Sequence, residues 1–349
     1  MKTRTLILAG LVLALAAMIV HTLYLAGSFR TIEPHFAGQC RAVEGVTGAE
    51  DITLDPHRPV AYLSGYDRRA AMAGEPHQGG LFRYSLDDPQ ARPMRLNHAP
   101  LTDFQPHGIS LYTDQQGRQS LFVINHGGGQ STVEIFDFDD GDLVHRRTLK
   151  NPLLNSPNDL HAVGHDQVYV TNDHGSRSEF GRTLEGYLRL PLANVVFFDR
   201  DEARQAAAGI RFANGINQSP DGLTIYVAAL TERGIAVYDR DPLTNVLDYR
   251  KTIRLKTSPD NIEVDDQGRL WVGAHPKVLE FVAHIDDPEH LSPSEVLRIT
   301  PFAEDNFGVD SIYLNAGEQL SGSSVAAVRG SRMLIGSVFE PHFLDCEME

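Results

Sequence analysis

Short apolar strands recur six times along the chain, at intervals of about fifty residues. Each follows a polar turn, such as Ser219-Pro-Asp-Gly222 ahead of the strand at 224–230. A fixed period of this length, made of short strands, is typical of a β-propeller with one repeat per four-stranded blade. The sequence therefore predicts an all-β fold, a six-bladed β-propeller. The predicted strands are 60–65, 120–126, 168–174, 224–230, 269–275 and 332–338.

A second repeat, made of polar side chains, lies just ahead of the first. In a propeller, equivalent positions of successive blades face one central axis, so these side chains are expected to converge in the channel. They are carboxylates, carboxamides and one histidine, without cysteine, and such oxygen ligands favour calcium over zinc or copper. The alternative is ordinary turns, because Asp, Asn and Gly commonly close the hydrogen bonds of their own loop. The repeat consists of Asp51, His107, Asp159, Asn214, Asp260 and Asp310.

Several longer strings resemble the paraoxonase/arylesterase family, in the same order, from about Cys40 to Cys346. The resemblance implies a six-bladed propeller with two calcium ions stacked in its central tunnel, and lactone hydrolysis as the main activity. The strings that carry it include Pro106-His-Gly-Ile109, Pro157-Asn-Asp159, Phe212-Ala-Asn-Gly-Ile-Asn217, Pro259-Asp-Asn-Ile262 and Leu270-Trp-Val-Gly273.

The resemblance also assigns individual positions. It places Phe212 and His275 in the lining of the substrate site, and His107 and His126 as a catalytic pair. For the structural calcium it implies Asp51, Asp159 and the main-chain carbonyl of Ile109. For the catalytic calcium it implies Glu50, Asn158, Asn214, Asp260 and Asn261.

These residue types fit ester hydrolysis. A calcium ion in a tunnel of low dielectric stabilises the oxyanion that forms when water attacks a carbonyl. Calcium lowers the pKa of bound water less than zinc does, so a separate base is useful, and histidine titrates near neutrality. We therefore expect His107 to take the proton from water and His126 to orient it or relay the proton. The alternative for each is a surface histidine or one with a structural hydrogen bond. The chain contains neither G-x-S-x-G nor H-E-x-x-H, so a serine hydrolase and a zincin are unsupported.

Asp310 departs from the family, which usually has a small hydroxyl or another non-acidic residue there. It follows Asp260 by 50 residues, in phase with the other axial clusters. We expect its side chain at the tunnel mouth, as an extra calcium ligand or as a second carboxylate that competes for the proton. The alternative is a solvated loop aspartate.

The two cysteines, Cys40 and Cys346, lie at opposite ends of the repeat region. A bridge between them would hold the first and last strands of the ring together. Loop-closure entropy gives such a bridge roughly 5 kcal/mol of stabilisation as an upper bound. The alternative is two buried free thiols. A disulfide would indicate an oxidising compartment.

The N-terminus is apolar from residue 6 to residue 20, follows Lys2 and Arg4, and carries no further charge before Arg30. Such a segment is a signal peptide or a membrane anchor. No good cleavage site follows Val20, which favours an uncleaved anchor with the propeller on the periplasmic or extracellular side; secretion is the alternative. The predicted division is 1–26 signal or anchor, 27–39 linker and 40–349 catalytic propeller.

A formal net charge of −15 argues against nucleic acid or anionic lipid as a partner. The sequence thus predicts a calcium-dependent hydrolase of small lactones and esters, with promiscuous arylesterase or phosphotriesterase activity. Aliphatic and N-acyl-homoserine lactones are substrates that the resemblance alone implies. The alternatives are a non-catalytic, calcium-stabilised binding platform, and a sugar lactonase or phosphotriesterase on the same scaffold.

Overall fold

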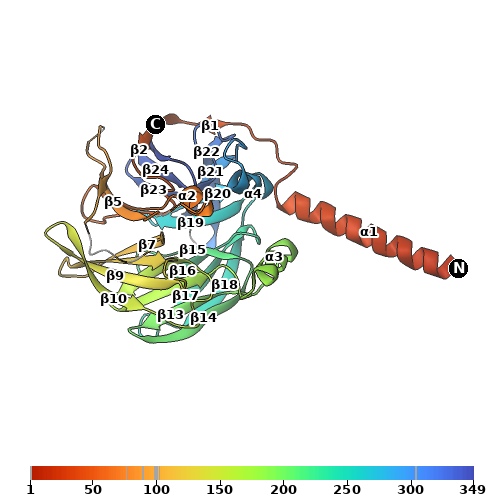
Figure 1. The fold of residues 1–349 in the computed structure, drawn as a ribbon, viewed down its shortest axis with the longest axis horizontal. Helices are drawn as coiled ribbons and strands as arrows, with labels where there is room; N and C mark the ends of the chain where they lie inside the picture. The colour runs from red at the N-terminus through yellow and green to blue at the C-terminus, as the bar shows by residue number, and fades with distance from the viewer. Residues whose placement is uncertain (1, 76, 89, 98–100, 102, 303–304) are drawn as a thin grey trace.

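The computed structural model describes residues 2–349 apart from 76, 89, 98–100, 102 and 303–304. Within them the chain forms six antiparallel sheets arranged as the blades of a propeller (Figure 1). The six strands predicted from the sequence are the second strands of the six blades, so the predicted fold is confirmed. These second strands are β4 (Val60–Gly65), β8 (Gln119–Asn125), β12 (Gln167–Asn172), β16 (Thr224–Ala229), β20 (Leu270–His275) and β24 (Arg332–Ser337).

The innermost strands surround the central tunnel. Each contacts the innermost strand of the next blade, and the last contacts the first, so they form a closed ring. The polar clusters of the sequence lie in these strands or just ahead of them, apart from Asp310. The innermost strands are β3 (Ile52–Leu54), β7 (Pro106–Thr113), β11 (Pro157–Gly164), β15 (Ala213–Gln218), β19 (Ser258–Val264) and β23 (Ser323–Arg329).

The third and fourth strands form the outer half of each blade. The third strands are β5 (Gly80–Ser85), β9 (Thr132–Asp139), β13 (Ala193–Asp199), β17 (Gly234–Arg240), β21 (Ser294–Pro301) and β25 (His342–Met348). The fourth strands are β6 (Met94–Arg95), β10 (Asp142–Leu149), β14 (Glu202–Ile210), β18 (Leu247–Arg254), β22 (Phe307–Asn315) and, from the N-terminal side of the chain, β2 (Gly38–Glu44).

The ring closes because β2 pairs antiparallel with β25 in the last blade. Cys40 and Cys346 face each other in this pairing and form a disulfide across 306 residues of sequence. The predicted bridge is therefore confirmed. Packing between blades completes the closure, since one apolar cluster joins Leu63 of the first blade to Val325 and Leu334 of the last.

Four α-helices accompany the sheets within the described part of the chain. The helices α2 (Arg68–Met72), α3 (Glu179–Leu188) and α4 (Val278–Asp286) follow β4, β12 and β20 directly. The helix α1 (Lys2–Leu25) extends away from the propeller (Figure 1). Among the helices of the described residues, none combines the length and the apolar character that crossing a membrane requires.

The segment expected to be a linker contacts the propeller. Its strand β1 (His35–Phe36) pairs with β22 at the outer edge of the fifth blade. Arg30 donates two hydrogen bonds to the carboxylate of Glu295, at 2.6 and 2.7 Å. These contacts attach the base of α1 to the same side of the ring as α4, where Val278 N donates to the carbonyl of Ala26.

Candidate active site and metal centre

Bulges in the innermost strands aim neighbouring side chains at the tunnel. In a regular strand, successive side chains point to opposite faces. Here the strand register shifts between Pro106 and Ile109 in β7, and the same irregularity recurs in β11, β15 and β19. A bulge inserts an extra residue and re-aims side chains locally. Pairs of adjacent residues, such as Asn158 and Asp159, therefore both reach the axis.

The side chains expected around the catalytic calcium lie in or just ahead of the innermost strands, and we call this set the upper level of the tunnel. All five are buried. Asn261 Nδ2 donates to Glu50 Oε1 at 2.9 Å. Asp260 Oδ2 lies 2.8 Å from His275 Nε2. Four blades thus supply this set, which consists of Glu50, Asn158, Asn214, Asp260 and Asn261.

Four oxygens of this set are buried and have no hydrogen-bond partner among the described residues. A buried polar atom without a partner is costly, so a cluster of them calls for a ligand. All four are carboxylate or amide oxygens, the donors that calcium prefers. Among the described residues, no group of three or more His, Cys, Asp or Glu is arranged to hold a metal; each predicted calcium set has two carboxylates, completed by amide or main-chain oxygens. The unpartnered atoms are Glu50 Oε2, Asn158 Oδ1, Asn214 Oδ1 and Asn261 Oδ1.

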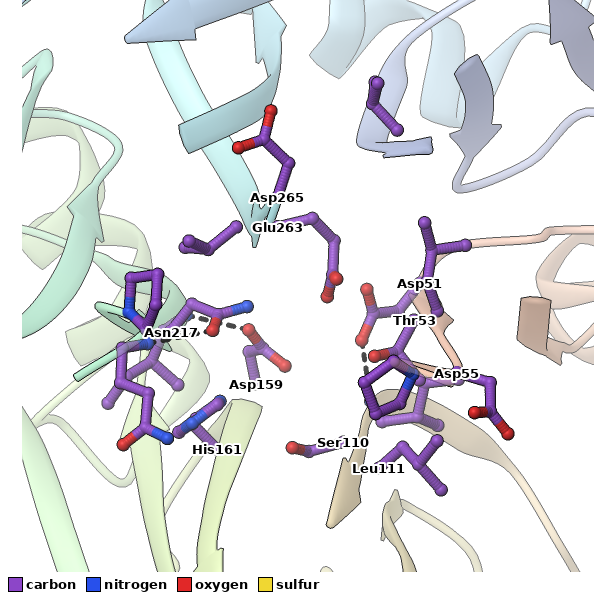
Figure 2. Close-up of a pocket in the computed structure, with 18 of the residues that line it drawn as sticks. Asp51, Thr53, Asp55, Ser110, Leu111, Asp159, His161, Asn217, Glu263 and Asp265 are labelled. Atoms are coloured by element: carbon purple, nitrogen blue, oxygen red, sulfur yellow. Dashed lines mark hydrogen bonds between the residues drawn. The ribbon is translucent and has the colours of Figure 1, made fainter. Parts of the chain in front are cut away.

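The lower level contains the carboxylates expected around the structural calcium. Asp51 Oδ2 accepts from Ile109 N at 2.7 Å, and Asp159 Oδ2 accepts from Ile216 N at 2.8 Å. Both carboxyl groups, with that of Glu263, face the open centre of a cavity of about 390 Å³ (Figure 2). These residues also fit a hard cation, with Ile109 lining the same cavity.

A glycine permits the close approach of two blades here. A Cβ atom on Gly108 would lie 2.6 Å from Asp159 Oδ1 and 2.7 Å from its Cα. Any larger residue would push the inner strands of these blades apart. Gly108 therefore permits the close approach of β7 and β11.

The tunnel carboxylates are poorly solvated. Burial raises the pKa of Glu50, an effect that the nearby Arg68 only partly offsets. Burial and the neighbouring Glu50 raise the pKa of Asp51, while burial and Asp51 raise the pKa of Asp159. A bound cation would remove this penalty, because opposite charge favours the ionised carboxylate. The raised pKa values of these carboxylates therefore favour a bound cation, as the set of oxygen ligands does.

The two predicted catalytic histidines are neighbours beside the upper level. The ring of His107 lies edge-on to that of His126, with centroids 5.0 Å apart. His107 Nε2 is 3.5 Å from Glu50 Oε1, and its side chain is 17% exposed while that of Glu50 is 2% exposed. The histidines therefore lie between the enclosed oxygens and the outside. Burial lowers the pKa of both to about 3, so both imidazoles are neutral at neutral pH.

An arginine fixes the proton of neutral His107. Arg68 Nη2 lies 3.1 Å from His107 Nδ1. A guanidinium can only donate, so Nδ1 accepts and the imidazole proton is on Nε2. On the other histidine, His126 Nδ1 lies 3.0 Å from the hydroxyl of Ser131.

An apolar cavity of about 520 Å³ adjoins the upper level. Its walls come from α3, α4 and the end of α1, and they include Phe212 and His275, the two residues expected to line the substrate site. His275 stacks on Phe281 of α4 with ring centroids 4.0 Å apart, and Phe212 packs edge-on against His174. The cavity can accept the apolar part of a small substrate.

Asp310 is not in the tunnel, and the prediction of an axial Asp310 is wrong. It lies in β22, the fourth strand of its blade, where its side chain is 55% exposed and pairs with Arg298 at 2.9 Å. The sixth innermost strand is β23, and Ser324 of that strand donates to the carbonyl of Glu50 at 2.6 Å. The segment that contains α4 separates β20 from β21 and makes the fifth blade longer than the repeat, so counting by the repeat reaches only the fourth strand of that blade.

Sequence reasoning missed Arg68 and Ser324. A signal for Arg68 was available, because residues just after two other second strands lie beside the site: His126 follows β8 and His174 follows β12. Arg68 follows β4 in the same way. Ser324 had no such signal, since serine is common in strands and turns alike.

Comparison with known proteins decides the family. The family model for arylesterase matches residues 32–348. The chain belongs to the arylesterase family. Serum paraoxonase/arylesterase 2 of Gallus gallus is 38% identical over 327 residues, which are 91% of each chain. Serum paraoxonase/arylesterase 1 of Homo sapiens is 35% identical over 330 residues, 92% of each.

Solved structures agree on the fold. A luciferin-regenerating enzyme superposes with a TM-score of 0.56 at 13% identity, covering 89% of this chain and 95% of its own. A regucalcin from Agrobacterium tumefaciens superposes with a TM-score of 0.54 at 15% identity, covering 91% and 98%. As an arylesterase-family member, the protein is an enzyme that hydrolyses ester bonds. The alternative of a non-catalytic platform therefore no longer holds.

Proposed function

We propose that this enzyme is a calcium-dependent lactonase with two ions in its tunnel. The observation that carries the proposal is the set of four buried oxygens, from Glu50, Asn158, Asn214 and Asn261, that have no partner among the described residues. Four unsatisfied acceptors in or beside the innermost strands fit a cation better than hydrogen bonds closed within turns. The lower ion would be held by Asp51, Asp159 and the carbonyl of Ile109.

Calcium at the upper level would supply electrophilic stabilisation of the charge that develops on the substrate carbonyl oxygen. The protein orients the ligand side chains and buries them away from water. Asn261 and Ser324 both donate to the carbonyl of Glu50, which fixes the backbone that presents this ligand. His275 similarly holds the carboxylate of Asp260. Supporting hydrogen bonds of this kind orient the groups around a metal.

We propose that His107 and His126 together handle the proton that the attacking water loses, with His107 as the base. Both are neutral, so each has one nitrogen lone pair that can accept a proton. In His107 that lone pair is on Nδ1, where Arg68 donates in the resting structure. His107 can therefore act as base at Nδ1 only when Arg68 moves to another acceptor. His126 is close enough to orient the water or relay the proton.

The proposed substrates are lactones and aryl esters whose apolar part fits the cavity of about 520 Å³ beside Phe212 and His275. Aliphatic and N-acyl-homoserine lactones fit this description, and phosphotriesters are a secondary class. We also propose that the enzyme acts outside the cytoplasm. The Cys40–Cys346 disulfide and the serum relatives support an exported protein. The membrane anchor expected from residues 1–26 stays a prediction.

The test is a lactone and aryl-ester panel assayed with the full chain. Chelator should abolish turnover, and calcium should restore it where magnesium does not, because magnesium demands a smaller octahedral site. Full activity in the metal-stripped enzyme would overturn calcium dependence. Calcium-dependent cleavage of aryl esters without any lactone turnover would overturn the lactonase assignment.

A further inference from the structure

Arg68 brings a positive charge into the active site from the short helix α2, because its guanidinium contacts His107. It is the first residue of α2, which begins three residues after β4 ends. Its Nη2 contacts His107, and its Nη1 donates to the carbonyls of Val338 and Tyr66, at 3.3 and 3.4 Å. Both carbonyl contacts are long for hydrogen bonds of this type. The guanidinium is thus placed beside the catalytic pair but is loosely bonded.

The next residue holds the helix in position. Arg69 donates to the carbonyls of His284 and Ile285 in α4, at 2.7 and 2.9 Å, and its guanidinium lies over the ring of Phe339. Asp67 caps α2 by accepting from Ala70 N at 2.9 Å. These contacts fix α2 against α4 without using Arg68. The fold itself therefore places Arg68 beside the site, because other residues hold α2 in position.

Arg68 has no ion-pair partner among the residues that the structure describes, whereas other arginines do: Arg30 pairs with Glu295 and Arg332 with Asp345. Burial lowers the pKa of Arg68, so its surroundings penalise its charge. Glu50 is the carboxylate that most offsets the penalty. A calcium ion on Glu50 would engage that charge, and Arg68 would be left without an anion.

An unpaired, partly buried guanidinium is an anion-binding group. It has five N–H donors, and three contacts with protein atoms leave donors free. We propose that Arg68 binds a carboxylate on the substrate, so that the preferred substrates are lactones carrying an anionic substituent beside the ring. This inference rests on the proposed lactonase function. The apolar cavity has different walls, from α3 and α4, so an alkyl group and a carboxylate would bind at separate places.

The experiment compares two lactones that differ only in charge. We would measure kcat/KM for 5-oxotetrahydrofuran-2-carboxylate and for the corresponding carboxamide, with the full chain in calcium. The wild-type enzyme should prefer the carboxylate. Arg68→Gln should reduce the carboxylate-to-carboxamide ratio by about tenfold to a hundredfold, the effect of losing a charge-assisted hydrogen bond. The ratio cancels any effect on His107 that both substrates share.

Two variants complete the design. Arg68→Lys keeps the charge without the planar fork, so it should retain part of the preference. Arg118→Gln removes the same charge from an exposed turn, where Arg118 pairs with Asp114, and should leave the ratio unchanged. An unchanged ratio in Arg68→Gln would overturn the inference, as would an equal fall in Arg118→Gln.

If neither lactone turns over, that result counts against the lactonase function alone. The role of Arg68 is then tested by binding. The unreactive 3-oxocyclopentane-1-carboxylate should bind the calcium-loaded enzyme in calorimetry, and Arg68→Gln should weaken this binding by a similar factor. No binding to the wild type, or equal binding to Arg68→Gln, would overturn the role of Arg68.

Discussion

Asp159→Asn separates the two proposed ions. The substitution removes one charge from the lower level, where burial and Asp51 raise the pKa of Asp159. It also disturbs two hydrogen bonds, because Asp159 Oδ1 accepts from Leu160 N and Oδ2 from Ile216 N. These losses act with and without calcium. The informative quantity is therefore the gain in stability when calcium is added to each protein.

The size of that gain can be estimated. An ion present at 100 times its Kd stabilises the folded state by about 2.7 kcal/mol. For a propeller of about 310 residues, the entropy of unfolding is roughly 0.65 kcal/mol per degree, so one ion raises Tm by about 4 °C. Calorimetry should find two calcium ions in the wild type and one in Asp159→Asn, whose calcium-dependent rise in Tm should be smaller by about 4 °C.

Asp55→Asn is the matched control. Asp55 lines the same cavity but is tied to its own turn, accepting from His57 N and Arg58 N, so its loss should leave the calcium increment unchanged. Two ions and an undiminished increment in Asp159→Asn would refute the reasoning.

The pH dependence supplies a second readout. A carboxylate whose pKa is raised by folding binds its proton more tightly in the folded state. The metal-free protein should therefore lose stability as the pH rises above about 4, through the range between the unfolded and folded pKa values of Asp51 and Asp159. Bound calcium favours the ionised forms and should reverse the trend. Asp159→Asn should flatten the slope of the metal-free protein.

The remaining predictions concern single substitutions. Asp260→Asn should remove the upper ion and lactone turnover while the propeller stays folded by circular dichroism. His107→Gln should lower kcat by about 10² or more, because glutamine cannot accept the proton. Cys346→Ser should lower Tm, because loss of the disulfide removes up to roughly 5 kcal/mol from the free energy of unfolding. Asp310→Thr should leave Tm and kcat/KM nearly unchanged, because its exposed ion pair contributes about 0–1 kcal/mol.

Each has a contrary outcome. Normal turnover in Asp260→Asn would remove that residue from the metal centre, and a few-fold change in His107→Gln would assign the base to another group. Cys346→Ser with an unaltered Tm would mean that strand pairing alone closes the ring. A shift in calcium affinity for Asp310→Thr would contradict its exposed position in β22.

The sequence by itself determined the blade repeat, because strand patterns and turn residues act over a few neighbours. It located all six second strands, and it placed Cys40 and Cys346 where the first and last strands meet. It also identified the residues that carry the tunnel oxygens, because each period of the repeat corresponds to one blade around the axis. For these features, the position of a residue in the sequence is enough to predict its place in the ring.

The tertiary structure decided what depends on contacts between blades. Counting by the repeat put Asp310 on the axis, but the segment with α4 between β20 and β21 lengthens the fifth blade, so the innermost strand of the last blade begins only at Ser323. The bulges that aim Asn158 and Asp159 together into the tunnel arise from pairing with the next strand. Arg68 contacts His107 from α2, a helix that Arg69 ties to the distant α4. Such features depend on which distant segments meet, and local sequence patterns do not record that.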